Sequence, residues 1–255
     1  MRFGLTNRCA GRRRDGFLVR AQILLLSLWT FSGGLATASA QGTPPPNAPK
    51  LPEILAQMDA VSAGFSSMTG DLEYTKVTVI VNDHSTQNGK IYFEKRSGKT
   101  RVLIGFTSPA EKYVLFSGGK VSMYQPKIAE VDEYELSERQ DLVEQFLLLG
   151  FGTSGADLQN AYQVTSRGND TVAGQPAYLL DLIPKSKSVA AQLQRIQLWI
   201  SPQNWEPIQQ KFYEPGGDYV IARYSNMKLN TKIPDSSFKL PLRGKVRTVR
   251  PQQAH

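Results

Sequence analysis

The chain has 255 residues, of which 40% are hydrophobic and 20% charged, with 21 glycines and 15 prolines. This composition is typical of a globular protein and excludes fibrous and low-complexity classes. The formal net charge is +8, but the excess lies at the two ends of the chain, and residues 41–238 hold about as many acidic as basic side chains. A nearly neutral body argues against nucleic acid as the main partner.

The first forty residues have the three parts of a secretory signal peptide. Arginines gather between 12 and 20, an apolar run covers 21–29, and the small residues Ala38-Ser39-Ala40 suit a signal peptidase. We therefore expect export and cleavage before Gln41. A paired-arginine export signal and a retained N-terminal anchor are the alternatives, although the apolar run is shorter than the ~20 residues that span a bilayer.

Cysteine usage and proline content characterise the exported chain. The single cysteine, Cys9, lies inside the signal peptide, so the exported chain has no thiol, no disulfide and no cysteine to carry lipid. Residues 41–50 contain four prolines and predict an extended spacer. We expect the folded domain to cover 51–242 and a basic tail to cover 243–255.

The hydrophobic pattern predicts one helix and then a run of strands. Apolar residues recur at three- and four-residue steps over 51–65, which indicates an amphipathic helix. After Asp71 the period becomes two, with turn signals such as Asn88-Gly89 and Gly216-Gly217. About eleven strands are expected, at 71–82, 90–96, 101–107, 113–117, 121–125, 130–136, 161–167, 177–184, 194–201, 207–214 and 218–230. So many short strands predict a large curved sheet or an open barrel.

One segment, 138–151, interrupts the strands. It begins with acidic residues after a potential Ser137 cap, continues with Phe and Leu, and meets Gly150 and Gly152 at its end. Such a helix could cover the mouth of a barrel and hinge away from it, or it could simply pack in the core.

The residues that usually perform catalysis are not arranged for it. The two histidines are His84, in a polar loop, and His255, at the end of the chain, so a histidine triad or a Cys/His metal site cannot be assembled. An acidic cluster over 130–135 alternates along a strand and is expected to face solvent. A carboxylate-pair hydrolase stays open as an alternative. We expect no catalytic residue, no metal site and no cofactor.

Apolar residues at alternate positions share faces of the predicted strands. They are Val102, Ile104 and Phe106; Tyr178, Leu180 and Leu182; and Ile196, Leu198 and Ile200. If these faces line one concave sheet, they form either a packed core or a cavity for an apolar ligand.

The order of elements resembles that of the LolA-like outer-membrane lipoprotein carriers. The resemblance is carried by GKIYFEKRSGKTRVLIGFTSPAEKYVLFSGGKVSMYQP (89–126), LWISPQNWEPIQQKFYEPGGDY (198–219) and IPDSSFKLPLRGKV (233–246). It implies a mainly β fold with some α: an unclosed antiparallel β-barrel, with helices that cover a hydrophobic cavity. It also implies a monomeric periplasmic carrier that takes acylated lipoproteins from an inner-membrane ABC transporter to an outer-membrane acceptor.

By position in the family pattern, Arg96 matches an arginine that hydrogen-bonds the lid, and 138–151 matches the lid itself. Ser97-Gly98-Lys99 departs from the pattern, so the neighbouring Lys95 is the alternative, as is a surface role for Arg96. The expected acyl-binding residues are Arg96, Val102, Ile104, Phe106, Val114, Phe116, Met123, Phe146, Leu147, Leu149, Leu180, Leu182, Ile196 and Leu198. An envelope sensor or a glycolipid-binding module of the same fold is the alternative function.

Overall fold

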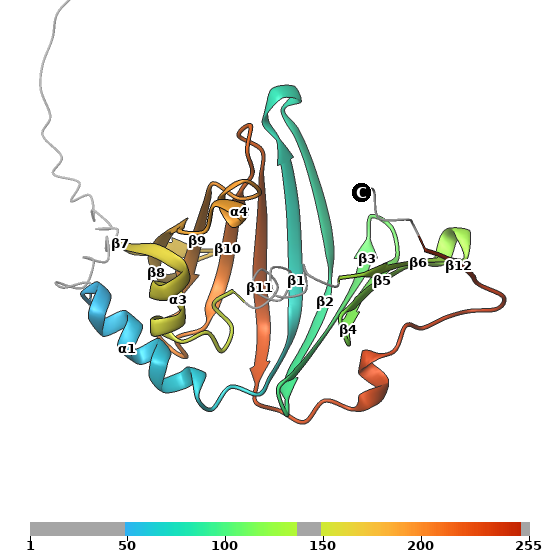
Figure 1. Ribbon diagram of the computed structural model, residues 1–255, viewed down its shortest axis with the longest axis horizontal. Coiled ribbons are helices and arrows are strands. Elements are labelled where there is room, and N and C mark those ends of the chain that lie inside the picture. The colour runs from blue at the N-terminus through green and yellow to red at the C-terminus, as the bar shows by residue number, and fades with distance from the viewer. Residues whose placement is uncertain (1–48, 137–148, 251–255) are drawn as a thin grey trace, which may run out of the picture. The chain divides into compact units, whose positions relative to one another are not determined.

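The computed structural model describes residues 49–136 and 149–250, and these form one continuous sheet with a few short helices (Figure 1). The strands are β1 (Ser67–Thr78), β2 (Asp83–Arg96), β3 (Lys99–Ser108), β4 (Lys112–Ser117), β5 (Lys120–Gln125), β6 (Glu130–Glu135), β7 (Tyr162–Val172), β8 (Gln175–Pro184), β9 (Arg195–Ile200), β10 (Pro207–Tyr213), β11 (Tyr219–Leu229) and β12 (Arg247–Val249). The helices are α1 (Leu51–Ser62), α3 (Gly155–Ala161) and α4 (Lys187–Ala190), with 3₁₀ turns η1 (Val79–Val81), η2 (Pro126–Ile128) and η4 (Asp235–Phe238).

The strands follow the order β12-β6-β5-β4-β3-β2-β1-β11-β10-β9-β8-β7. Neighbouring strands are antiparallel, except that β12 runs parallel to β6. The described sheet is unclosed, with β12 and β7 at its two edges. This confirms the predicted fold class, with twelve strands among the described residues where about eleven were expected.

The cross-strand register separates the sheet into two faces. Ile91, Ile104 and Val114 lie opposite one another on β2, β3 and β4, and we call their side of the sheet the inner face. Residues one position along each strand, such as Leu103, point to the outer face, because side chains alternate along a strand.

Two helices cover the inner face of β8 and β9. Ile54, Leu55 and Met58 of α1 and Leu158 of α3 are buried in one cluster with strand residues. Helix α1 has Pro52 in its first turn, and the Lys50 N–H donates a hydrogen bond to the Glu53 side chain. Both features favour the start of a helix here. The helix ends at Ser62, three residues before the predicted end.

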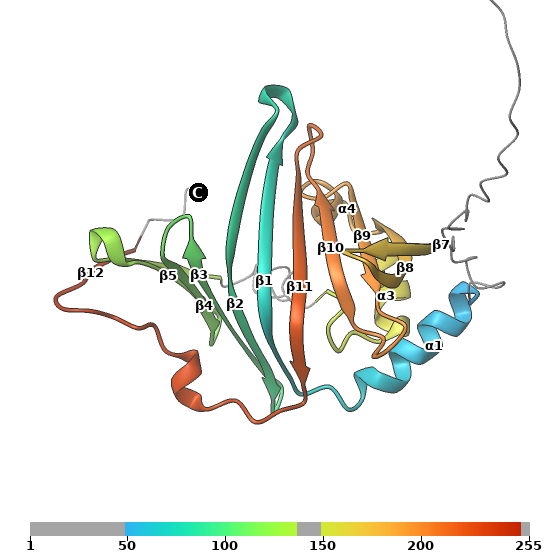
Figure 2. The same cartoon turned by 180° about the vertical axis from the view of Figure 1, so that it is seen from behind.

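The segment after β11 passes the ends of β2 and β3 and continues beside the neighbouring strands (Figure 2), and its apolar residues cover part of the outer face. Ile233 and Phe238 are buried against Leu103 of β3, with Tyr92 and Leu115 beside them. This apolar cover explains why Leu103, on the outer face, is only 6% exposed.

The predicted turn at Asn88-Gly89 is wrong, because both residues lie inside β2. The chain reverses earlier, at η1, where Asn82 has a φ of 49°. Gly89 instead marks a β-bulge opposite β3, where a Cβ atom would lie 2.2 Å from the Gly105 carbonyl oxygen. The glycine is needed for this close approach of two backbones and not for a reversal.

The basic tail also differs from expectation, because residues 247–249 extend the sheet as β12. Arg243, Arg247 and Arg250 form ion pairs with Glu111, Glu130 and Glu133. The acidic residues of β6 were expected to face solvent. Residues 247–250 instead pair with this strand and with two of its glutamates. Among residues 49–136 and 149–250, no helix is both long and apolar enough to span a bilayer.

Candidate functional site

The expected ligand-binding residues of β3, β4 and β5 lie together on the inner face. Val102 pairs with Phe116, and Ile104 pairs with Val114, which in turn pairs with Met123. Val102 and Phe116 are almost fully buried, whereas Ile104, Val114 and Met123 are partly buried. With Phe93 and Ile91 of β2, they form an apolar surface that we call the β2–β5 surface. Phe106, which is 4% exposed, lies at one end of this surface.

The expected residues of β8 and β9 lie on the same face but in a different setting. Leu180 and Leu182 pair with Leu198 and Ile196, and all four are fully buried beneath α1 and α3. Leu149, 2% exposed, joins this cluster. We call it the helix-covered core. The sequence left open whether these residues form a packed core or line a cavity, and in the structure they form a packed core.

A chain of aromatic rings lies between these two regions. Phe65, just after α1, stacks on Phe93 with ring centroids 5.3 Å apart, and its ring centroid lies 6.5 Å from that of Phe151. Phe151 meets Tyr224 of β11 edge to face at 4.9 Å. Gly152 permits this packing, since a Cβ atom there would lie 2.4 Å from the Phe65 ring and its φ is +56°.

Buried polar groups hold the same loop, 149–154, onto the sheet. Gln210 of β10 donates its side-chain N–H to the Leu149 carbonyl oxygen and accepts a 2.8 Å bond from the Tyr224 hydroxyl. Glu206 accepts a bond from Gly152 N–H at 3.3 Å. Both Gln210 and Glu206 are 2% exposed, so each bond is made away from water, where an unmade one would be costly.

Sequence reasoning missed these polar residues. Gln210 lies on the inner face of β10, two positions from Phe212, so it is a polar residue at a position where the alternation predicts an apolar one. That mismatch was the available signal. Burial raises the pKa of Glu206 to about 8, although the Gly152 N–H acts in the opposite direction.

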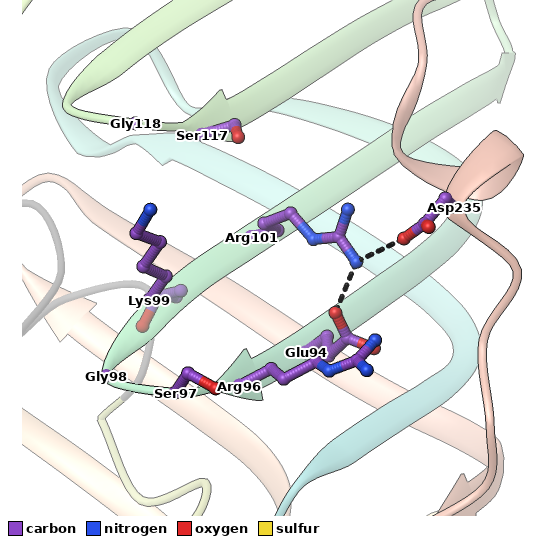
Figure 3. Close-up of a pocket in the computed structure, with 10 residues that line it drawn as sticks. Glu94, Arg96, Ser97, Gly98, Lys99, Arg101, Ser117, Gly118 and Asp235 are labelled. Carbon is purple, nitrogen blue, oxygen red and sulfur yellow. Dashed lines mark hydrogen bonds and ion pairs between the residues drawn. The ribbon is translucent and has the colours of Figure 1, made fainter.

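Arg96 lies on the other side of the sheet. It is the last residue of β2 and pairs with Lys99, the first residue of β3. Two positions from Glu94, it belongs with that residue to the outer face. Arg101 binds Glu94 and, at 2.8 Å, Asp235, and these residues with Arg96 line an open hollow of about 620 Å³ (Figure 3). Arg96 was expected beside the acyl-binding residues, but it lies on the opposite face of the sheet from them. Because side chains alternate along a strand, Lys95 is the one of the two that belongs to the inner face.

The expected lid falls largely on residues 137–148, which lie outside the described part of the chain, as do Phe146 and Leu147. Its two flanks are described. Leu136 packs beside the β2–β5 surface, and Leu149 belongs to the helix-covered core. Across the described ranges, no group of three or more His, Cys, Asp or Glu side chains is placed to hold a metal ion.

The described residues form an unclosed, mainly β fold with an apolar inner face, and a family comparison assigns its class. The family model of the outer membrane lipoprotein carrier protein LolA matches residues 63–241, and the chain belongs to this family. The family consists of carriers or binding proteins and not of enzymes.

Individual relatives are distant. An uncharacterized protein of Methanocaldococcus jannaschii is 23% identical over 188 residues, 73% of this chain and 50% of that protein, so the chain spans about half the length of this curated relative. The structure of a LolA superfamily protein from Nitrosomonas europaea is 17% identical, with a TM-score of 0.37 and coverage of 76% and 99%. Pseudomonas aeruginosa MucB, in its complex with MucA, is 14% identical, with a TM-score of 0.45 and coverage of 74% and 60%.

Proposed function

We propose that this protein is a periplasmic carrier that binds the acyl chains of lipoproteins on the inner face of its sheet and takes them from the inner to the outer membrane. The observation that carries the proposal is the β2–β5 surface. Its residues Ile104, Val114 and Met123 are apolar and only partly buried, whereas the helix-covered core is already filled. An unfilled apolar surface beside a filled core is where an acyl chain would find new contacts.

The energetics suit transport without chemistry. Each buried CH₂ group contributes about 0.8 kcal/mol, so an acyl chain of ordinary length is held by hydrophobic burial alone. Contacts of this kind are non-directional, so cargo can enter and leave without a bond being made or broken. In this proposal the donor is an inner-membrane ABC transporter, the acceptor lies in the outer membrane, and the carrier acts as a monomer after removal of residues 1–40.

The loop 149–154 gives the carrier a place to couple cargo to a conformational change. Gln210 and Glu206 bind this loop through Leu149 and Gly152, directly after the segment that the sequence suggests as a lid. In the proposal, these buried bonds take over the anchoring role that the family pattern suggested for Arg96.

Native mass spectrometry of the protein purified from its own periplasm tests the function. We expect the protein to retain acyl-bearing molecules, and their masses to identify lipoproteins. A glycolipid as the bound species would assign the protein to glycolipid binding, and an envelope protein bound without any acyl chain would assign it to sensing. Either result would contradict the lipoprotein-carrier proposal.

A further inference from the structure

The tip of the β1–β2 hairpin carries three consecutive aliphatic residues that are exposed. Val79, Ile80 and Val81 are 51%, 88% and 69% exposed, and Ile80 is the most exposed large hydrophobic residue of the described chain. In both views the hairpin extends beyond its neighbouring strands (Figures 1 and 2). Single exposed apolar residues are ordinary, but three in a row at a projecting tip indicate an interaction site.

The tip is held in a defined shape. Strands β1 and β2 pair without interruption up to Thr78 and Asp83, and the 3₁₀ turn is closed by a bond from Asn82 N–H to the Val79 carbonyl oxygen. A second bond, 2.9 Å long, runs from Val79 N–H to the Asp218 carboxylate beside β11. Because these bonds already fix the turn, its aliphatic side chains can be buried elsewhere with little further loss of conformational entropy.

We propose that Val79, Ile80 and Val81 insert into the interfacial region of a lipid bilayer and dock the protein on membranes. A tip of three side chains presents far less area than the ~800 Å² per partner of a stable protein interface. It also has the convex form of a membrane anchor and not that of a groove for a peptide. A few aliphatic side chains at headgroup depth are enough for weak, reversible membrane binding.

The charges near the tip favour apolar insertion over electrostatic attachment. Acidic and basic groups are mixed there: Lys76 pairs with Glu214 at 3.8 Å, and Asp83 and Asp218 lie beside the turn. In the basic C-terminal region, Arg243, Arg247 and Arg250 are paired with glutamates. Membrane docking by the tip should therefore not require anionic lipid and should resist salt.

The docking proposal does not depend on the carrier function, so its test uses vesicles without cargo. In a chain that begins at Gln41, and so contains no cysteine, an environment-sensitive dye is attached at Ile80→Cys or, as the control, at Ile183→Cys, a residue of β8 that is 42% exposed. With phosphatidylcholine vesicles, we expect a blue shift of dye emission at position 80 and none at position 183, at both 0.1 M and 1 M salt. No shift at position 80, an equal shift at both positions, or a shift that needs anionic lipid and disappears at high salt would overturn the proposal.

A second measurement uses unlabelled protein. Ile80→Ser should lower the vesicle partition coefficient about tenfold, since the burial of one large aliphatic side chain is worth about a factor of ten. Ile183→Ser should leave the coefficient unchanged. Equal partitioning of Ile80→Ser and the parent would overturn the proposal, whether or not the protein carries acyl cargo.

Discussion

At the scale of single residues, Glu206, which binds the loop 149–154, should make the free energy of unfolding depend on pH. Its side chain is 2% exposed, and burial raises its pKa to about 8 from the ordinary value of 4.5. The folded protein therefore keeps a proton on Glu206 between these two pH values, where the unfolded chain has lost it. The contribution of this group to the free energy of unfolding is complete below about pH 4.5 and is lost as the pH rises through about 8.

Glu206→Gln should remove this pH dependence, because an amide can accept the Gly152 N–H bond at any pH. Urea unfolding at pH 5 and pH 8.5 measures the effect. The free energy of unfolding of the parent should decline between these values by on the order of a few kcal/mol more than that of the variant. Parallel pH profiles for the two proteins would show that the folded state holds Glu206 ionised.

Tyr162 gives a second prediction about a single residue. Its hydroxyl is buried without a hydrogen-bond partner within the described part of the chain, and burial raises its pKa to about 12. Because an unpaired buried hydroxyl is destabilising, Tyr162→Phe should raise the free energy of unfolding by about 1 kcal/mol. Tyr224→Phe is the matched control: it removes the 2.8 Å bond to Gln210 and should lower this free energy by a similar amount. Urea denaturation would contradict the prediction if both variants lost stability.

At the scale of elements, β12 changes the role of the C-terminal region. Its backbone pairs with β6, and Arg247 Nε donates to Glu130 at 2.9 Å. Each exposed ion pair contributes at most about 1 kcal/mol, so the protection of the β6 edge matters as much as the charges.

Truncation after Leu242 should therefore lower the melting temperature by several degrees and promote self-association, because it uncovers the edge of β6. Truncation after Arg250, which keeps β12, is the control and should leave both properties unchanged. Thermal unfolding followed by circular dichroism, together with analytical ultracentrifugation, measures the two effects. A monomeric 242-residue variant with the melting temperature of the parent would show that β12 adds no stability.

The sequence predicted an element well where the pattern depends on that one strand or helix and not on its neighbours. The alternation at Val102, Ile104 and Phe106 gave a correct shared face, because period two follows from strand geometry alone. Gly89 was misread because a glycine suits both a tight turn and a close backbone approach, and only the β3 register distinguishes them. Arg96 was placed by family pattern although Phe93 already fixed the phase of β2, so alternation alone could have corrected it.

Long-range packing could not be derived from the sequence. Whether Leu198 lines a cavity or fills a core depends on α1 and α3, which come from distant segments and cover it. Likewise, the acidic residues of β6 gave no sign that Arg247 and Arg250 would return more than a hundred residues later to bind them.

At the scale of the whole molecule, the apolar inner face has two parts. The helix-covered core, with Leu180, Leu182, Ile196 and Leu198 fully buried, stabilises the fold at one side of the sheet. The β2–β5 surface, with Ile104 partly buried, lies at the other end of the same face and is where the proposed carrier would hold its ligand. Stability and ligand affinity should therefore respond to mutations in different regions.

The separation of the two regions is tested by Leu198→Ala and Ile104→Asp. Leu198→Ala leaves a void in a filled core and should lower the free energy of unfolding by about 2–5 kcal/mol, with the affinity for a fluorescent fatty-acid analogue unchanged. Ile104→Asp places a charge on the β2–β5 surface and should weaken that affinity at least tenfold, since an acyl chain would have to desolvate the carboxylate. Arg96→Leu, on the outer face, should leave the affinity unchanged. Fluorescence titration of folded proteins gives the affinities and urea unfolding the stabilities. If Leu198→Ala weakened binding as much as Ile104→Asp, the acyl chain would have to lie under α1 and α3, and the assignment of the two regions would be reversed.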